Sequence, residues 1–177
     1  MTARESRSFQ GREDVNHCMW QLSDRADPAS RAIADRHYNR QKPGTPQFVP
    51  PGRCLVLRAD EALWVTSWPL AEYVRHAWPG AWINSCFRRE GGEHVASDMI
   101  RAAVAATRWK WPDVPDLGMV TFVDARKVRH KRDPGRCYRH AGFRRCGETK
   151  GGLVAWQMLP EDMPDPAEPL LAQGVML

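Results

Sequence analysis

Apolar residues recur along the chain in short runs that predict five strands. The runs at 54–57 and 63–68 flank a polar turn at Asp60-Glu61 and predict a hairpin, and 119–123 is typical of a buried strand. Residues 80–88 alternate, which predicts that Trp82, Asn84, Cys86 and Arg88 share one face of a strand. A last strand is expected over 153–159, after Lys150 and two glycines.

Three helices are predicted between these strands. Asp27-Pro28 is a cap followed by a first-turn proline, and the helix it starts reaches 37–38. A second helix begins at Ser97 and ends before Pro112, with an apolar stripe at Ile100, Ala103, Val104 and Thr107. A third is expected from Asp133-Pro134 through Tyr138 to Gly142. The order of elements predicts an α/β (α+β) fold in which a mixed central sheet is flanked by helices.

The chain length allows one well-buried domain. Of its 177 residues, the polar stretch 1–14 is expected to be disordered, 15–159 to form the domain, and 160–177 to be a tail rich in proline and acids that wraps the surface or is mobile. No apolar run approaches the length of a membrane span, and the first residues lack a hydrophobic signal core. Five cysteines without paired spacing favour a reducing compartment. A cytoplasmic protein without a membrane partner is therefore expected.

Positive charge is concentrated in the first 150 residues. The whole chain carries +5, but no Lys or Arg follows Lys150 while four acids do, so residues 1–150 carry +9. Nine Lys or Arg residues lie between Arg126 and Arg145 with one acid, Asp133. This run follows a predicted strand, where open sheets bind ligands, so a nucleic acid such as double-stranded DNA, or another polyanion, is the expected partner. The residues expected to hold phosphates are Arg126, Lys127, Arg129, Lys131 and Arg132; the alternative is a solvated loop.

The stretch from Phe122 to Phe143 resembles part of a known enzyme family. A strand, a polar residue, a loop and then Tyr-x-x-x-Gly-Phe resembles the closing half of the GNAT acyltransferase fold. More narrowly, Phe122-Val123-Asp124-Ala125-Arg126 with a basic loop and Tyr138 is similar to the phage Mom family, as are His37-Tyr38 and Ser97. The resemblance covers roughly residues 33 to 158.

That resemblance implies a GNAT-like domain that transfers a carbamoylmethyl or acyl-type group to adenine N6 in DNA. It implies an anti-restriction role and a phage or prophage gene acting in a bacterial cell. Asp124 would orient or deprotonate the amino group, Tyr138 would act as an acid or hydrogen-bond donor, and Ser97 would complete the catalytic set. His37 and Tyr38 would lie at the rim and bind DNA. Simpler structural roles are a helix cap for Ser97, a loop anchor for Asp124 and a core aromatic for Tyr138.

The cofactor prediction rests on the segment that ends the alternating strand. GNAT enzymes bind a pyrophosphate at the next helix N-terminus through Arg/Gln-x-x-Gly-x-Gly/Ala, whereas this chain has Arg88-Arg89-Glu90-Gly91-Gly92. Asn84, Arg88 and Arg89 are expected to contact a cofactor whose identity stays open, with acetyl coenzyme A as one option. The alternative functions are an N-acetyltransferase acting on a small amine or protein amino group, and a catalytically silent DNA-binding module. No metal site is expected, because Cys137 and His140 lack a second ligand pair.

Overall fold

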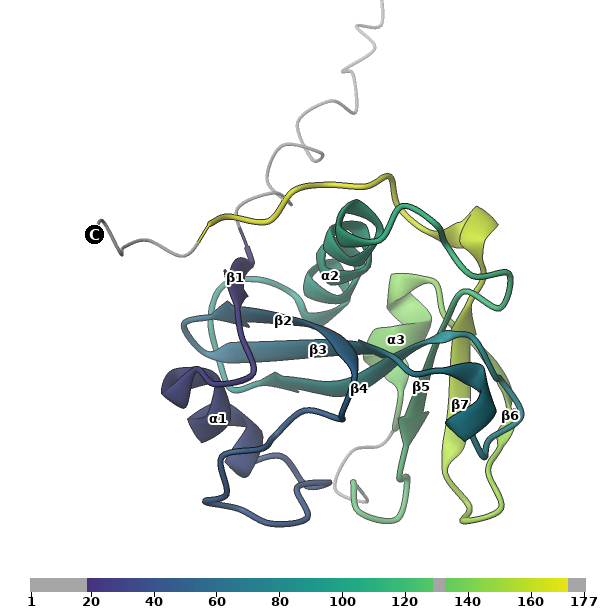
Figure 1. Ribbon diagram of the computed structural model, residues 1–177, viewed down its shortest axis with the longest axis horizontal. Helices are drawn as coiled ribbons and strands as arrows, with labels where there is room; N and C mark the ends of the chain where they lie inside the picture. The colour runs from purple at the N-terminus through teal and green to yellow at the C-terminus, as the bar shows by residue number, and fades with distance from the viewer. Residues whose placement is uncertain (1–18, 129–132, 172–177) are drawn as a thin grey trace, which may run out of the picture.

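The computed structural model describes residues 19–128 and 133–171, and seven segments of this chain pair into one mixed sheet. The strand order is β1-β2-β3-β4-β5-β7-β6, and every neighbouring pair is antiparallel except β4 and β5, which are parallel. Figure 1 shows β2, β3 and β4 crossing the view, while β5, β7 and β6 run steeply beside them. The strands are β1 Gln21–Ser23, β2 Arg53–Ala59, β3 Ala62–Trp68, β4 Trp82–Arg89, β5 Met119–Val123, β6 Arg144–Glu148 and β7 Val154–Met158.

Helices lie on both faces of this sheet, which confirms the predicted mixed sheet flanked by helices. Helix α1 (Pro28–Asp35) covers one face, and α2 (Ala96–Lys110) with α3 (Arg136–Ala141) covers the other (Figure 1). Two single-turn 3-10 segments, η3 (Ala71–Tyr73) and η4 (Pro160–Asp162), lie in connections. The described residues form one α+β domain.

The main core lies between α2 and the sheet. Trp20, Trp64 and Trp82 are each no more than 2% exposed, so these tryptophans are core anchors. The predicted stripe on α2 is confirmed, because Ile100, Ala103, Val104 and Thr107 are completely buried. Burial of each large apolar side chain stabilises the fold by about 1.5–3 kcal/mol. A smaller cluster under α1 fills the opposite face.

Local signals explain where α1 begins and where α3 ends. The Asp27 carboxylate accepts hydrogen bonds from the backbone N–H groups of Ala29 and Ser30, and Pro28 takes the first helical position, as predicted. Arg58 of β2 also pairs with Asp27 at 3.1 Å, which fixes the helix start against the sheet. Helix α3 ends at Gly142, whose φ of 105° is the left-handed value that favours glycine.

The predicted starts of α2 and α3 are wrong. The residue before α2 is Val95, which makes no side-chain cap, and Ser97 is the second helical residue. The N-cap of α3 is Gly135 in a left-handed conformation, while Asp133 pairs with Arg139 instead. Neither Ser97 nor Asp133 is therefore the N-cap, because the preceding loops lead into the helices at Val95 and Gly135.

The sequence pattern missed β1 and β6. All of β6 except Gly147 is exposed, so its residues carry no apolar alternation, and it forms only because β7 offers a free edge. The tail also pairs. The N–H of Leu22 in β1 donates to the carbonyl of Leu170 at 2.8 Å, and Met163 is buried in the main core. Figure 1 shows this yellow segment passing over α2, so the tail wraps the surface as far as residue 171.

Strand β4 contains a bulge that the alternating pattern did not reveal. Val65 of β3 pairs with Cys86, but the next residue, Thr66, pairs with Asn84, so Ser85 is an extra residue on β4. A bulge of this kind reverses the faces of all residues beyond it.

The predicted common face of Trp82, Asn84, Cys86 and Arg88 is therefore wrong beyond the bulge. Trp82 lies in the core under α2, whereas Cys86 lies in the cluster under α1. Phe87 turns to the α2 side instead, where its ring contacts those of Trp64 and Tyr138.

Candidate functional site

A cavity opens where β4 and β5 separate. These parallel strands pair through only three residues each, ending at Asn84 and Thr121, although β4 continues to Arg89 and β5 to Val123. Beyond this point the strands are not linked by pairs. The gap between them, which we call the wedge cavity, has a volume of about 350 Å³.

The wedge cavity brings together several of the predicted site residues from five parts of the chain. It is bordered by the residues after α1, by β4, by the start of α2, by the end of β5 and its loop, and by α3. The predicted residues among its lining are His37, Tyr38, Asn84, Arg88, Arg89, Lys127 and Tyr138. Asp124, Ser97 and Arg126 are not in this lining.

Asn84 is the hydrogen-bonding hub at the closed end of the cavity. Its amide nitrogen donates to the carbonyls of Val65 at 3.1 Å and Cys86 at 2.9 Å, which braces the bulge. Its carbonyl oxygen accepts from the Tyr138 hydroxyl at 2.8 Å and from the Thr121 hydroxyl at 3.1 Å. Both amide hydrogens and the oxygen are thus engaged within the protein, and Asn84 is only 4% exposed. This geometry suits a positioning residue rather than the predicted cofactor contact.

Tyr138 is buried with its hydroxyl directed to this hub. Burial is the main influence on its pKa, which it raises well above the usual value for tyrosine. The phenol is therefore protonated at neutral pH. Since its proton is donated to Asn84, Tyr138 presents only oxygen lone pairs to other groups in this arrangement.

Asp124 lies immediately after β5, and its side chain is bound to its own loop. Arg126 donates to its carboxylate through Nε and through its backbone N–H, both at 3.1 Å. This contact with Arg126 is the main reason that the pKa of Asp124 is lowered, so the carboxylate is ionised at neutral pH. No hydrogen bond joins Asp124 and Tyr138. The structure therefore does not place the predicted carboxylate and phenol in direct contact.

Tyr38 links the two. Its hydroxyl is hydrogen-bonded to the backbone of Asp124, and Tyr38 lies close enough to Tyr138 to contribute to the raised pKa of Tyr138. Burial raises the pKa of Tyr38, so this phenol is also protonated. Its ring stacks on His37 with centroids 4.5 Å apart. This pair was predicted to lie at the rim, and the contact of Tyr38 with the residue after β5 reveals its central position.

Among the described residues, four cations line the wedge cavity and no Asp or Glu does. Arg36 and Arg88 share one carboxylate, Glu90, at 2.6 Å each, and these contacts lower the pKa of Glu90 to about 2. Arg89 donates only to backbone carbonyls, and Lys127 has no ion-pair partner within the described chain. Three positive charges are therefore uncompensated, which favours an anionic ligand. Arg36 was not predicted, because its partner Glu90 is 54 positions away.

Ser97 faces a neighbouring cavity of about 490 Å³ at the start of α2. Cys137 and His140 also line this space, and Ala96 lines both this cavity and the wedge cavity. Because α2 has no side-chain cap, its first N–H groups are open to an anion there. Ser97 is thus near the site but separated from Asp124 and Tyr138.

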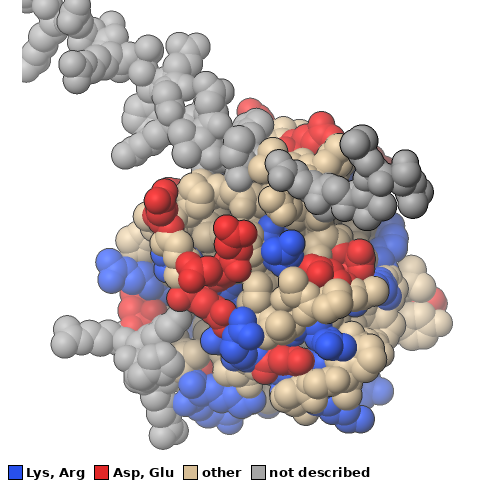
Figure 2. Space-filling view, turned by 90° about the vertical axis from the view of Figure 1, so that its left-hand side faces the viewer, with Lys and Arg blue, Asp and Glu red and all other residues tan. Residues whose placement is uncertain are grey.

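The predicted basic loop is only partly described. Arg126 is tied to Asp124 and to the carbonyl of Gly151 at 3.1 Å, whereas Arg129, Lys131 and Arg132 lie outside the described residues. Figure 2 views the end of the molecule that carries α1. It shows Lys and Arg gathered along the lower rim, where the loops after α1 and β5 lie, and Asp and Glu mostly across the middle and the upper part.

Comparisons with known proteins do not assign this cavity a role. No family model, curated protein or solved structure matches the chain. Within residues 19–128 and 133–171, no group of three or more His, Cys, Asp and Glu side chains is placed to hold a metal ion. Among the helices of the same residues, none has the length and apolar character needed to cross a bilayer.

Proposed function

We propose that this protein is a transferase that modifies the N6 amino group of adenine in DNA, in the manner of the Mom family. The observation that carries the proposal is the acid-free wedge cavity, where the separated ends of β4 and β5 meet two protonated phenols and three uncompensated cations. Such a cavity suits a donor molecule with negatively charged groups. In this proposal the donor enters between the separated strands, and the base approaches from the loop after α1.

The side chains support a division of roles. The ionised Asp124 carboxylate holds its own loop through Arg126 and orients the amino group of the acceptor, while the backbone of Asp124 holds the Tyr38 hydroxyl. Its lowered pKa makes it a weak proton acceptor, so orientation is its main contribution. Tyr38 supplies a hydrogen bond to the reacting groups, whereas Tyr138, which Asn84 fixes, accepts one on its oxygen. Lys127 and the basic loop that follows it contact phosphates.

Nucleoside mass spectrometry tests the proposal directly. DNA from bacteria expressing the protein is expected to contain a modified deoxyadenosine that is absent from cells expressing the Asp124→Asn or Tyr38→Phe variants. Tyr73→Phe is the matched control, because Tyr73 is 75% exposed on η3 and does not line the wedge cavity. Unmodified DNA in the presence of folded wild-type protein would contradict the proposal. So would full activity of the Asp124→Asn and Tyr138→Phe variants.

One observation also favours a second candidate, an N-acetyltransferase that uses acetyl coenzyme A. The uncapped start of α2 beside Arg88 and Arg89 is a suitable place for a pyrophosphate. This candidate predicts that acetyl coenzyme A binds the purified protein and that Arg89→Ala weakens the binding. The two candidates are then separated by the acceptor, a small or protein amine against adenine in DNA.

A further inference from the structure

A second cavity adjoins the wedge cavity on the other side of the β4 bulge. This space, which we call the loop cavity, lies between β4 and the loop after α1 and has a volume of about 710 Å³. Small-molecule sites usually measure about 300–1,000 Å³. His37, Asn39, Ser85 and Cys86 line both cavities. A molecule in the loop cavity therefore meets a molecule in the wedge cavity at the bulge.

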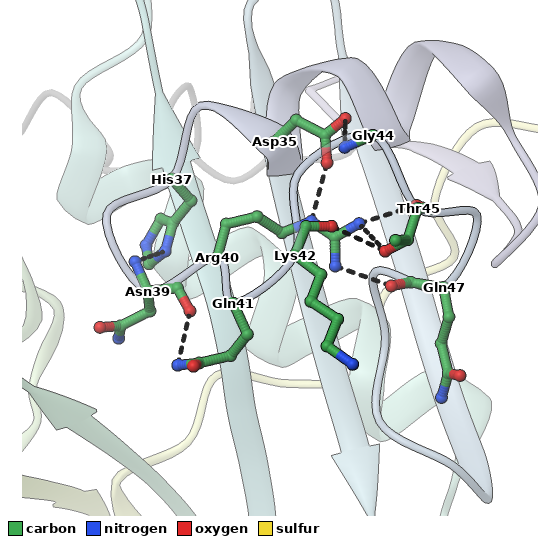
Figure 3. A network of polar contacts seen from close by, with 9 residues as sticks. All are labelled: Asp35, His37, Asn39, Arg40, Gln41, Lys42, Gly44, Thr45 and Gln47. Carbon is green, nitrogen blue, oxygen red and sulfur yellow. Dashed lines mark hydrogen bonds and ion pairs between the residues drawn. The ribbon is translucent and has the colours of Figure 1, made fainter.

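The wall of the loop cavity is held in shape by Arg40, an arginine whose side chain is mostly covered. Arg40 donates to the carboxylate of Asp35 at 2.7 Å, to the carbonyl of Gln47 at 2.7 Å and to the carbonyl of Thr45 at 2.8 Å. Figure 3 shows these contacts converging on the guanidinium from both ends of the loop. The Arg40 side chain is only 11% exposed, so its donors are committed to the loop. The cavity is thus preformed.

The charges of this cavity limit what it can bind. Its lining contains no Asp or Glu. The nearest acid in the network, Asp35, accepts from Arg40 and from the backbone N–H of Gly44, and the contact with Arg40 is the main reason that its pKa is lowered. Lys42 also lines the cavity, and its amine has no partner in the described chain; Figure 3 draws no contact to it. One uncompensated cation therefore remains.

This arrangement discriminates between two kinds of amine. An alkylamine is a cation at neutral pH, since such groups have pKa values near 10.4, and a nearby carboxylate favours its binding. Here it would meet Lys42 without a free acid nearby. The amino group of a nucleobase is uncharged and needs no carboxylate. The cavity lining also includes the aromatic ring of Phe48 and the apolar rings of Pro46 and Pro50, and such surfaces suit a base.

We infer that the loop cavity is a nucleotide site, in which a neutral amino-bearing base lies toward the bulge and its phosphate contacts Lys42. This inference rests on the proposed function and specifies where its acceptor binds. The base amino group then lies beside the opening to the wedge cavity, and the donor reaches it without crossing the sheet. The same chemistry is offered by a free nucleotide and by a base extruded from DNA.

Calorimetric titration of the full-length protein tests the site with deoxyadenosine monophosphate, deoxyadenosine and spermidine. The monophosphate is expected to bind about fivefold more tightly than the nucleoside, as one exposed ionic contact allows. Lys42→Ala should remove this fivefold difference and leave nucleoside binding unchanged. Lys110→Ala is the control, because Lys110 is exposed and lines a different cavity. The inference is overturned if the monophosphate does not bind, if Lys42→Ala leaves its affinity unchanged, or if spermidine binds more tightly than the nucleotide.

A DNA strand distinguishes the two sources of the base. A ten-nucleotide thymidine strand with one central deoxyadenosine should bind more tightly than the strand without it if the cavity accepts a base from DNA. Equal binding of the two strands, together with Lys42-dependent binding of the monophosphate, assigns the site to a free nucleotide. In that case the nucleotide site stands and the proposed action on DNA fails. If the protein modifies DNA and Lys42→Ala does not change the rate of modification, the proposed function stands and the nucleotide site in the loop cavity fails.

Discussion

Replacing Asn84 by alanine removes the side chain on which four hydrogen bonds converge at the closed end of the wedge cavity. The Tyr138 hydroxyl loses its acceptor at 2.8 Å, although Tyr138 is only 8% exposed and water has little access. Thr121 keeps an alternative, because its hydroxyl also lies 3.2 Å from the backbone oxygen of Asn84. The change therefore leaves the buried Tyr138 hydroxyl with only its weaker contact to Thr121, and it deprives the carbonyls of Val65 and Cys86 of a donor.

The expected loss follows from these contacts. A buried hydroxyl without a partner costs about 1–3 kcal/mol, and with the two weakened carbonyls Asn84→Ala should lower the free energy of unfolding by about 3 kcal/mol. Tyr138→Phe alone should cost about 1 kcal/mol, since the Asn84 oxygen still accepts from Thr121 at 3.1 Å. In the Asn84→Ala background, Tyr138→Phe removes a poorly paired buried hydroxyl and should instead stabilise the fold by about 1 kcal/mol. The coupling free energy is then about 2 kcal/mol.

Urea unfolding followed by tryptophan fluorescence measures all four proteins, because Trp20, Trp64 and Trp82 are buried and report global unfolding. Tyr73→Phe serves as the control and should change the free energy by less than about 0.5 kcal/mol, since Tyr73 is exposed. The change of sign for Tyr138→Phe is the decisive result. An equal loss in both backgrounds would refute the hydrogen bond between Asn84 and Tyr138.

Three further predictions concern stability. Ser85→Ala should leave the free energy of unfolding unchanged or raise it by up to about 1 kcal/mol, because the buried Ser85 hydroxyl has no partner in the described chain; a clear loss in urea unfolding would show that it has one. Stability should fall as the pH drops from about 4 to about 2. Burial opposes ionisation of Asp27, but its hydrogen bonds prevail and lower its pKa from 3.8 to about 2. The ionised Asp27 therefore stabilises the fold at pH values above its unfolded-state pKa, and this stabilisation is lost as the pH falls through its folded-state pKa. Asp27→Asn should flatten that acid limb in calorimetric scans, and an unchanged limb would exclude Asp27 as its source. Gly135→Ala should lower the free energy of unfolding by more than about 3 kcal/mol, because the φ of Gly135 is +85° and a Cβ there would lie 2.6 Å from the Trp156 ring. Gly44 has a similar φ of +80° but open space around it, so Gly44→Ala should cost only about 1–2 kcal/mol. Equal losses for the two variants in urea unfolding would contradict the contact with Trp156.

Much of the fold follows from local rules that a sequence carries openly. Asp27 followed by Pro28 starts α1 because a carboxylate and a proline satisfy the first turn without help from distant residues. The β-branched run at 119–123 forms β5 because such side chains fit a buried pleated strand. Candidate site residues at the end of that strand were identifiable for the same reason, and Tyr38 and Tyr138 do reach a common cavity.

Only the tertiary structure decided how the site is assembled. The bulge at Ser85 depends on pairing with β3, and it reverses the faces that simple alternation predicts for Cys86 and Phe87. Strand β6 has no apolar pattern and forms on the edge of β7. Sequence motifs describe contacts between near neighbours, whereas Arg36 reaches Glu90 and Asn84 reaches Tyr138 across 54 positions each. Those contacts exist because the sheet brings distant segments together, and they set the charge and the hydrogen bonding of the wedge cavity.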